Sequence, residues 1–523
     1  MGHPHNRVGH TLFAITLTAA FASSMKAQET TPEAPDRQRR STTDGFDYAF
    51  DRVSFEVTKS LGKRPAFVIW LLDGTASIEA RTKQVVARSK QLYAGKRPHR
   101  LYSAIGVFGK HARIPMQEPV SDYQSLAIAA EQIKADNSGR ENVFAAVELG
   151  LHYWKDFIAE HRPLDVSIVI VTDERGDDFG LKGESAIDAC VEAGVRVFCL
   201  GHAAPFGQQK GRIRFRYPDG FDEWIAVDQG PETPRLESLH LPPWPWPKGK
   251  AAPIVSSGFG PWGLSRLCSA TDGRFFIAED AADVMFTRST MKHYRPDYRS
   301  IATIIDTPTS GKIQFALHSA FTHPGFSHND LPRTSFRADR PFNLRSSITR
   351  TLAEATILDD KLSMSETELR KVIDDRQKIT NKRLAATFDL ALGRILAMRS
   401  RIASFNAALR HMRTSTRKFA DPGNNTWSIH STPLDNDKQT GESAIEATRL
   451  LNQVISNHRE TPFAAVAKAE LDLGFEWTWE ESRRDYHPLE QIEKPLLLQQ
   501  RPQAIGGGFG PARVPRGGRK PQL

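Results

Sequence analysis

The sequence predicts an α/β domain with a doubly wound, mostly parallel sheet, followed by a mainly α-helical region. Short apolar runs alternate with helical patterns over residues 62–285, as expected for strands buried on both faces of a sheet. After residue 346, apolar residues recur every three or four positions, which is the spacing of an amphipathic helix. At 523 residues, the chain is also too long for one core.

Each predicted strand is an apolar run closed by turn residues. The run at 66–73 (AFVIWLLD) ends in an acid followed by glycine, and the run at 166–173 (VSIVIVTD) also ends in an acid. The expected strands are residues 66–73, 102–108, 166–173, 195–201 and 274–278, with a short edge at 112–115. The expected helices are residues 79–93, 123–135, 143–160, 185–193 and 263–270. This alternation favours helices on both faces of the sheet.

An insertion at about residues 204–260 interrupts this domain. Residues 211–229 alternate in polarity around a Pro-Asp-Gly turn, which predicts a β-hairpin. A stretch rich in proline and tryptophan follows the hairpin. Trp224, Trp244 and Trp246 either form an exposed recognition surface or pack this loop onto the domain.

Two less regular segments flank the domain. Residues 28–61 are polar and mixed in charge, and we interpret them as a linker with a lead-in helix or strand. Residues 286–345 show no sustained period and are interpreted as an irregular accessory region. Within that region, residues 301–305 and 312–317 could form strands.

Residues 346–487 form the predicted helical region. A long helix is expected at 365–413, because one apolar stripe continues through it without proline. The stripe consists of Leu384, Phe388, Leu392, Ile395, Met398, Ile402, Phe405, Leu409 and Met412. Such a stripe serves either self-association through a coiled-coil hairpin or an intramolecular bundle. A final helical pair is expected at 444–458 and 462–473, with Trp477 and Trp479 behind it.

The two ends of the chain predict its location. Residues 1–27 resemble a secretory signal peptide with a short apolar run, although an uncleaved membrane anchor is the alternative. We therefore expect export to the periplasm, the cell surface or the medium. Residues 488–523 form an expected disordered basic tail that could contact an anionic surface. The net charge of +9 comes without any nucleic-acid recognition motif, so no nucleic-acid partner is expected.

Oxygen-bearing side chains follow the strand at 66–73. Asp73, Thr75 and Ser77 alternate along the loop, so one carboxylate and two hydroxyls can surround a single point. Asp173 closes another strand, and the carboxyl ends of parallel strands gather at one edge of a sheet. Hard oxygen donors suit Mg²⁺ or Ca²⁺ rather than zinc. Thr75 and Ser77 could instead cap the next helix.

This loop and the order of elements resemble the von Willebrand factor type A domain, over about 220 residues. That family carries a metal-ion-dependent adhesion site with a D-x-[S/T]-x-S loop, which Asp73, Thr75 and Ser77 match, and a later aspartate matched by Asp173. The family's separate threonine falls where this chain has Glu141. Glu141 either completes a set of three carboxylates as a possible fifth ligand or points to solvent.

The resemblance implies a metal-dependent interaction protein. The expected ion is Mg²⁺, with Ca²⁺ or Mn²⁺ possible, and the expected partner is a protein or matrix ligand. An enzyme is not expected. The segment Leu72-Asp73-Gly74-Thr75 resembles the D-x-D-G-T loop of haloacid dehalogenase-like phosphatases, but Leu71 stands where that family has its nucleophilic aspartate. The alternative is a structural scaffold with a metal-free domain. The cysteines, Cys190, Cys199 and Cys268, are expected to be small buried hydrophobes.

Overall fold

The computed structural model describes residues 44–486 with internal gaps. The gaps are residues 76, 95–97, 137, 218–219, 235–240, 242–243, 245–252, 327–330, 416 and 433–440. The predicted signal peptide at 1–27, the basic tail at 488–523 and Trp246 lie outside the described residues, so those predictions stay untested. Among the described residues, no helix has the length and apolarity needed to span a membrane.

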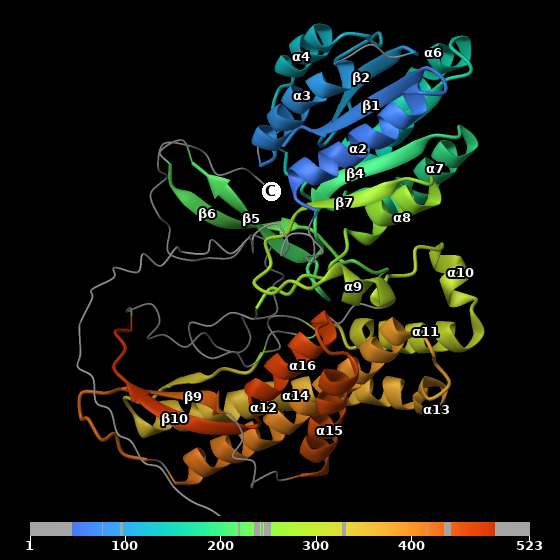
Figure 1. Cartoon of the computed structure of the whole chain (residues 1–523). Coiled ribbons are helices and arrows are strands. Elements are labelled where there is room, and N and C mark those ends of the chain that lie inside the picture. The colour runs from blue at the N-terminus through green and yellow to red at the C-terminus, as the bar shows by residue number, and fades with distance from the viewer. Residues whose placement is uncertain are drawn as a thin grey trace, which may run out of the picture.

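A parallel sheet of five strands, in the order β2-β1-β3-β4-β7, forms the core of the first domain (Figure 1). The strands are β1 (Ala66–Asp73), β2 (Leu101–Phe108), β3 (Asp165–Val171), β4 (Arg196–His202) and β7 (Arg274–Glu279). All eight residues of β1 are buried, as its unbroken apolar run requires. The short edge expected at 112–115 is present as an antiparallel bridge between Val107 and Arg113.

Helices flank the sheet in two groups, and within each group the neighbouring helices pack on one another. One group holds α2 (Phe46–Leu61), α3 (Glu79–Tyr93) and α4 (Tyr123–Glu131). The other holds α5 (Val143–Tyr153), α6 (Lys155–Glu160), α7 (Phe179–Glu192) and α8 (Trp262–Ala270). The predicted α/β fold class is therefore confirmed. The helix expected at 143–160 is divided at Trp154, which separates α5 from α6.

The segment interpreted as a linker, 28–61, is not one throughout. Residues 46–61 form α2, and Phe50 on this helix stacks on Trp70 of β1 with ring centroids 6.0 Å apart. Buried residues recur every three or four positions along α2, among them Val53 and Val57. The charged residues between them occupy the outer face, which gives the segment its polar composition.

The insertion forms a two-stranded antiparallel hairpin of β5 (Lys210–Arg216) and β6 (Asp222–Asp228), seen in green at the side of the domain in Figure 1. Its two described tryptophans behave differently. Trp224 is 54% exposed, whereas Trp244 is buried against Phe405 and Trp477 of the helical region. The insertion therefore has an exposed aromatic on its hairpin and an anchoring aromatic in the loop that follows.

Residues 286–345 are mostly helical rather than irregular. They form α9 (Arg288–Met291), the 3₁₀ helix η2 (Lys292–Tyr294), α10 (Ile301–Ile305), α11 (Pro308–Thr322) and strand β8 (Ser335–Arg337). The strands expected at 301–305 and 312–317 are wrong, because both segments are helical. Local signals explain this: Ser300 caps α10 by accepting from Thr303 N, and Pro308 occupies the first turn of α11.

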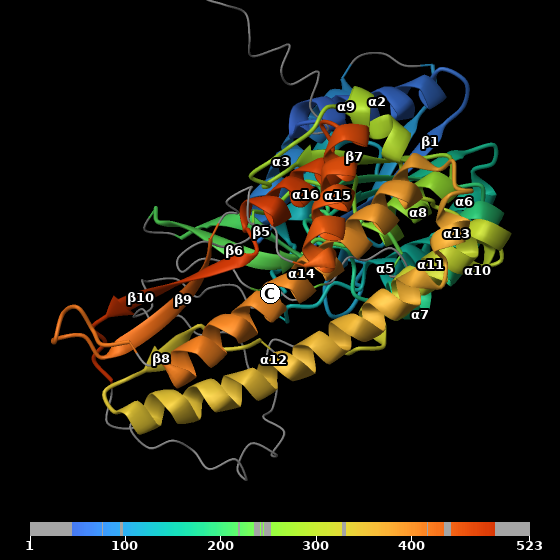
Figure 2. The ribbon, with the colours of Figure 1, turned by 90° about the horizontal axis from the view of Figure 1, so that it is seen from below.

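A helical bundle forms the second part of the chain. Its helices are α12 (Pro341–Arg370), α13 (Ile373–Arg376), α14 (Lys382–Thr414), α15 (Glu442–Asn457) and α16 (Pro462–Asp472). Helices α12 and α14 run side by side (Figure 2), and α15 and α16 also pack on α14. The apolar stripe of α14 is buried throughout, so it is covered within the chain. This packing is a bundle rather than a single coiled-coil hairpin.

The long helix expected at 365–413 is broken. It ends as α12 at Arg370 and resumes as α14 after Asn381, whose side chain accepts from Leu384 N at 3.1 Å. Asparagine is a strong helix start signal, and here it overrides the continuous apolar period.

The region behind the last helices is a small sheet with the order β10-β9-β8. Strand β9 is Thr426–Thr432 and β10 is Glu476–Ser482, so Trp477 and Trp479 belong to a strand. Trp477 packs on Phe405 with ring centroids 4.8 Å apart. The sheet thus closes one side of the bundle core.

Buried polar contacts join the two parts of the chain. Arg383, at the start of α14, donates to Glu232 Oε1 at 2.8 Å, and both side chains are at most 5% exposed. Arg383 also donates to the carbonyl of Tyr294 at 2.9 Å, and the Tyr294 hydroxyl pairs with His458 of the bundle at 3.0 Å. Separating the parts would leave a charged pair without partners, which is costly.

Arg401 is fully buried inside the bundle. Its guanidinium donates to Glu470 Oε2 at 2.9 Å and to the carbonyl of Gly474 at 2.8 Å, and it also bonds the Glu470 carbonyl. One side chain therefore ties α14 to the end of α16.

We predict that Arg401→Ala lowers the free energy of unfolding by about 3 kcal/mol. Glu470 stays buried and loses one of the two ion pairs, with Arg394 and Arg401, that it forms among the described residues. Arg410→Ala, at an exposed position of the same helix, should change it by less than about 0.5 kcal/mol. Urea unfolding followed by circular dichroism measures both. Equal effects from the two variants would contradict the prediction.

Candidate metal centre

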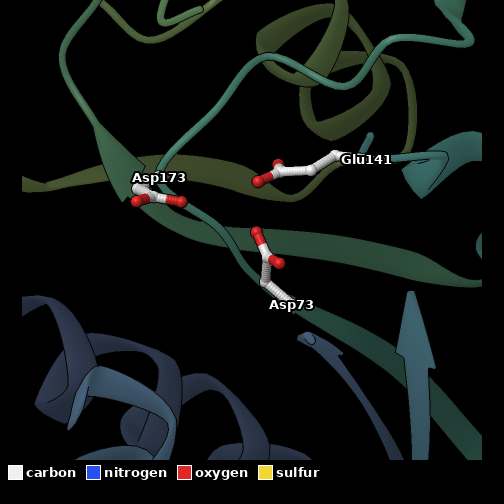
Figure 3. Close-up of side chains that lie close together, drawn as sticks. All are labelled: Asp73, Glu141 and Asp173. Atoms are coloured by element: carbon white, nitrogen blue, oxygen red, sulfur yellow. The ribbon is translucent and has the colours of Figure 1, made fainter. Parts of the chain in front are cut away.

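Three buried carboxylates from separate segments meet at the carboxyl edge of the parallel sheet (Figure 3). Asp73 ends β1, and Asp173 lies two residues beyond the end of the neighbouring strand β3. Glu141 precedes α5. One oxygen atom from each carboxylate lies within 4.8 Å of the others, so together they could hold a metal ion.

The three side chains are almost inaccessible to water. Asp73 is 2% exposed, Glu141 1% and Asp173 3%. The structure therefore places Glu141 in the cluster rather than in solvent, where the sequence had left two possibilities open. Charged groups at this depth require compensation by protons, hydrogen bonds or a cation.

The loop after β1 turns its polar groups toward the same point. Thr75 donates to Asp73 Oδ1 at 2.8 Å through both its backbone N–H and its hydroxyl. The hydroxyls of Thr75 and Ser77 are 3.0 Å apart, and Thr75 Oγ1 lies 3.5 Å from Glu141 Oε1. The five predicted site residues are thus brought together. Neither Thr75 nor Ser77 caps α3, whose cap position shows no side-chain bond.

Thr172 bridges two of the carboxylates. Its hydroxyl lies 2.9 Å from Glu141 Oε2 and 3.2 Å from Asp73 Oδ2. A hydroxyl has one hydrogen, so it can donate to only one of these oxygens at a time. The same oxygen accepts from Glu174 N at 3.1 Å, which holds the turn after β3 in place.

The segment after Asp173 fixes the position of Glu141. Asp177 Oδ2 accepts from Glu141 N at 3.1 Å, and Asp177 N donates to the Glu141 carbonyl at 2.8 Å. Asp178 accepts from the N–H groups of Phe144 and Ala145 at the start of α5. The carboxylate-bearing loops therefore support each other through their backbones.

The insertion hairpin is fastened to the same segment. Arg175 N donates to the Asp228 carbonyl at 2.9 Å, and the two side chains form an ion pair at 2.9 Å. Asp228 N in turn approaches Glu174 Oε1 at 3.4 Å. The end of β6 thus lies directly against the turn that carries Asp173.

Burial dominates the electrostatics of the centre. It raises the pKa of Asp73, and together with the charge of Asp73 it raises the pKa of Glu141 well above its usual range. Burial and the Asp73 charge raise the pKa of Asp173 to about 7. Burial and the Asp173 charge raise the pKa of Glu174 to about 8. Crowded carboxylates in a low dielectric favour either protons or a bound cation.

The donor set fits a hard divalent cation. Asp173 Oδ1 is buried without a hydrogen-bond partner, and no ion pair within the described ranges involves Asp73, Glu141 or Asp173. The hydroxyls of Thr75 and Thr172 supply too few hydrogens for the oxygens around them. Oxygen ligands alone, without nitrogen or sulfur, suit Mg²⁺, Ca²⁺ or Mn²⁺.

Comparisons with known proteins give the chain no family. No protein-family model matches it, and a search of curated proteins finds no relative. Among solved structures, the VWA domain of SpRpn10 is similar over 26% of this chain and 74% of that chain, at 9% identity and a TM-score of 0.21. A likeness at that score carries no argument, so the α/β assignment rests on the strand order and connections described above.

Sequence reasoning missed the groups that surround the ligands. Thr172 and the buried Glu174 adjoin Asp173, and Thr-Asp-Glu at the end of an apolar strand is the signal that could have identified them. Asp177 and Asp178 also belong to these surrounding groups. Their contacts with Glu141 and α5 join segments 36 and 34 residues apart, which no local pattern reveals.

We predict that metal stabilises the protein more at pH 8 than at pH 6. The folded pKa of Asp173 is about 7, above its ordinary value of 3.8, so this carboxyl favours the metal-free fold at low pH. That contribution is lost as pH rises from about 4 through about 7. A metal must displace the protons, so its affinity rises by up to about tenfold per pH unit for each proton released.

Thermal unfolding of the full chain with Mg²⁺ or with EDTA at pH 6, 7 and 8 measures this effect. Asp173→Asn, which cannot ionise, should flatten the pH dependence of the metal-induced shift. A shift that is equal at pH 6 and pH 8 in the native chain would contradict the prediction.

Proposed function

We propose that the protein is a metal-dependent protein-binding module that acts outside the cytoplasm, and not an enzyme. The observation that carries the proposal is the buried convergence of Asp73, Glu141 and Asp173 at one edge of the sheet. Thr75 and Ser77 add hydroxyl oxygens beside them. Mg²⁺ is the favoured ion, with Ca²⁺ or Mn²⁺ as alternatives, since all these ligands are hard oxygens.

The charge of the centre restricts the partner's contribution. Three ionised carboxylates around a divalent cation leave a net charge of −1, counting three negative charges against two positive ones. A fourth carboxylate from a partner would then be repelled rather than attracted. The partner ligand that fits is a neutral oxygen, such as a backbone carbonyl or a hydroxyl, from a protein or matrix surface.

A metal-stabilised scaffold is the second candidate, and a specific observation favours it. The three carboxylates are at most 3% exposed, so an ion among them would be largely enclosed by the chain. In that case the ion would hold together the loops after β1 and β3 and before α5 without meeting a partner. The two functions differ in one respect: only the first requires metal for binding another protein.

The metal part of the proposal predicts Mg²⁺ binding that depends on Asp73. In isothermal titration of the full chain, we expect one saturable site that Asp73→Asn weakens by about a hundredfold, because a buried ligand charge is lost. Glu79→Gln is the matched control, since Glu79 is an exposed acid close in sequence that forms an ion pair with Lys83 at the surface. Equal loss in both variants, or no binding by the native chain, would contradict a metal site.

The binding part is tested with the same variants. The full chain is immobilised and exposed to extracellular-matrix and cell-envelope proteins in Mg²⁺, and retained proteins are eluted with EDTA. We expect proteins that the native chain and Glu79→Gln retain but Asp73→Asn does not. If the metal binds but nothing elutes with EDTA, the adhesion function is wrong and the scaffold function is supported.

A further inference from the structure

A cavity lies at the β7 edge of the sheet, away from the residues of the metal centre. It has a volume of about 650 Å³ and is enclosed by β7, α8, the turn at 258–260 and the segment at 288–298. None of its lining residues belongs to the metal centre. The volume falls in the usual range for sites that bind small molecules, about 300–1,000 Å³.

The cavity is strongly basic. Four cations line it, Arg274, Arg288, Lys292 and Arg295, against the single carboxylate of Asp44. Four positive charges less one negative charge leave a net charge of +3. Like charges gathered around one cavity produce a positive potential, which attracts an anion.

The one acid is already engaged. Asp44 accepts from Arg288 at 2.5 Å and from Ile277 N at 3.1 Å, which fixes the chain beside β7. Among the described residues, Arg274, Lys292 and Arg295 form no ion pair with a carboxylate. Arg295 instead donates to the Ser269 hydroxyl at 3.3 Å. The guanidinium groups of Arg274 and Arg295 also lie over the rings of Phe276 and Tyr298, each 5.2 Å from the ring centroid. Among the described residues no carboxylate neutralises these three cations, so their charges can attract an incoming anion.

The rest of the lining supplies both polar and apolar contacts. Three serine side chains line the cavity, Ser265, Ser269 and Ser289, and the buried Ser265 hydroxyl lies beside Tyr298. Phe259, Phe275 and Tyr298 provide aromatic surface.

We propose that this cavity binds a small organic phosphate. The phosphate group would be held by Arg274, Lys292 and Arg295, because guanidinium groups bind phosphate oxygens in a bidentate manner and a dianion offsets more of the positive charge than a carboxylate does. The organic part would lie against the aromatic side chains. Bound there, the ligand would connect the edge of the sheet to the segment that leads into the helical bundle.

The test is isothermal titration of the full chain with phenyl phosphate, with inorganic phosphate and phenyl sulfate as comparison ligands. EDTA in the buffer keeps divalent metal from contributing. We expect one saturable site that prefers phenyl phosphate to both comparison ligands, since inorganic phosphate lacks the ring and phenyl sulfate carries one charge fewer.

The double variant Lys292→Ala/Arg295→Ala should weaken phenyl phosphate binding by about tenfold or more, because charge-assisted hydrogen bonds are lost. Both residues are exposed, so the fold should survive, and Arg274→Gln is a second variant that tests the same site. Lys90→Ala/Arg410→Ala removes two exposed cations elsewhere and should leave the affinity unchanged.

Three results would overturn the proposal. The first is no saturable binding of phenyl phosphate by the native chain. The second is an equal loss of affinity in the site variant and the control variant, which would indicate attraction by net charge alone. The third is equal binding of phenyl sulfate or inorganic phosphate, which would show that the cavity does not select an organic phosphate.

Discussion

The burial of β1 on both faces is the constraint on which the rest of the domain depends. A strand with no exposed residue must lie in the middle of the sheet, and here it pairs with β2 on one side and β3 on the other. Its last residue, Asp73, is therefore buried at the end of the sheet where the carboxyl ends of the strands lie. The oxygens that lie around Asp73, including those of Thr75 and Glu141, come from loops that the sheet order brings to that end of the strands.

The strands of the sheet were predicted well because each one is marked by a local signal, an apolar run bounded by turn residues. The limits of β1 and α3 are as the apolar period indicates, and the other strands differ by one or two residues. The errors occur where tertiary contacts or caps decide the structure. Helix α2 has a polar composition that its packing on Trp70 overrides. The expected long helix stops at Arg370 and begins again only after the cap at Asn381. The buried cysteines agree with the prediction, as all three are buried and unpaired.

Part of the candidate site could also be predicted from the sequence. Asp73, Thr75 and Ser77 share a loop, and Asp173 closes an apolar strand, so their convergence followed from the expected fold. The orientation of Glu141 did not follow, because it depends on hydrogen bonds between its backbone and Asp177, 36 residues away. The role of Thr172 also escaped, since a hydroxyl shared by two carboxylates is visible only once both are placed.

The buried ion pair between Arg383 and Glu232 has a mechanical consequence. Glu232 follows the hairpin that is fastened to the turn carrying Asp173, and Arg383 begins the longest helix of the bundle. A pull on the bundle would be carried along α14 into this pair and from there toward the turn after β3. Force applied to the bundle would therefore be transmitted through α14 to the loop that carries Asp173 before the ion pair broke.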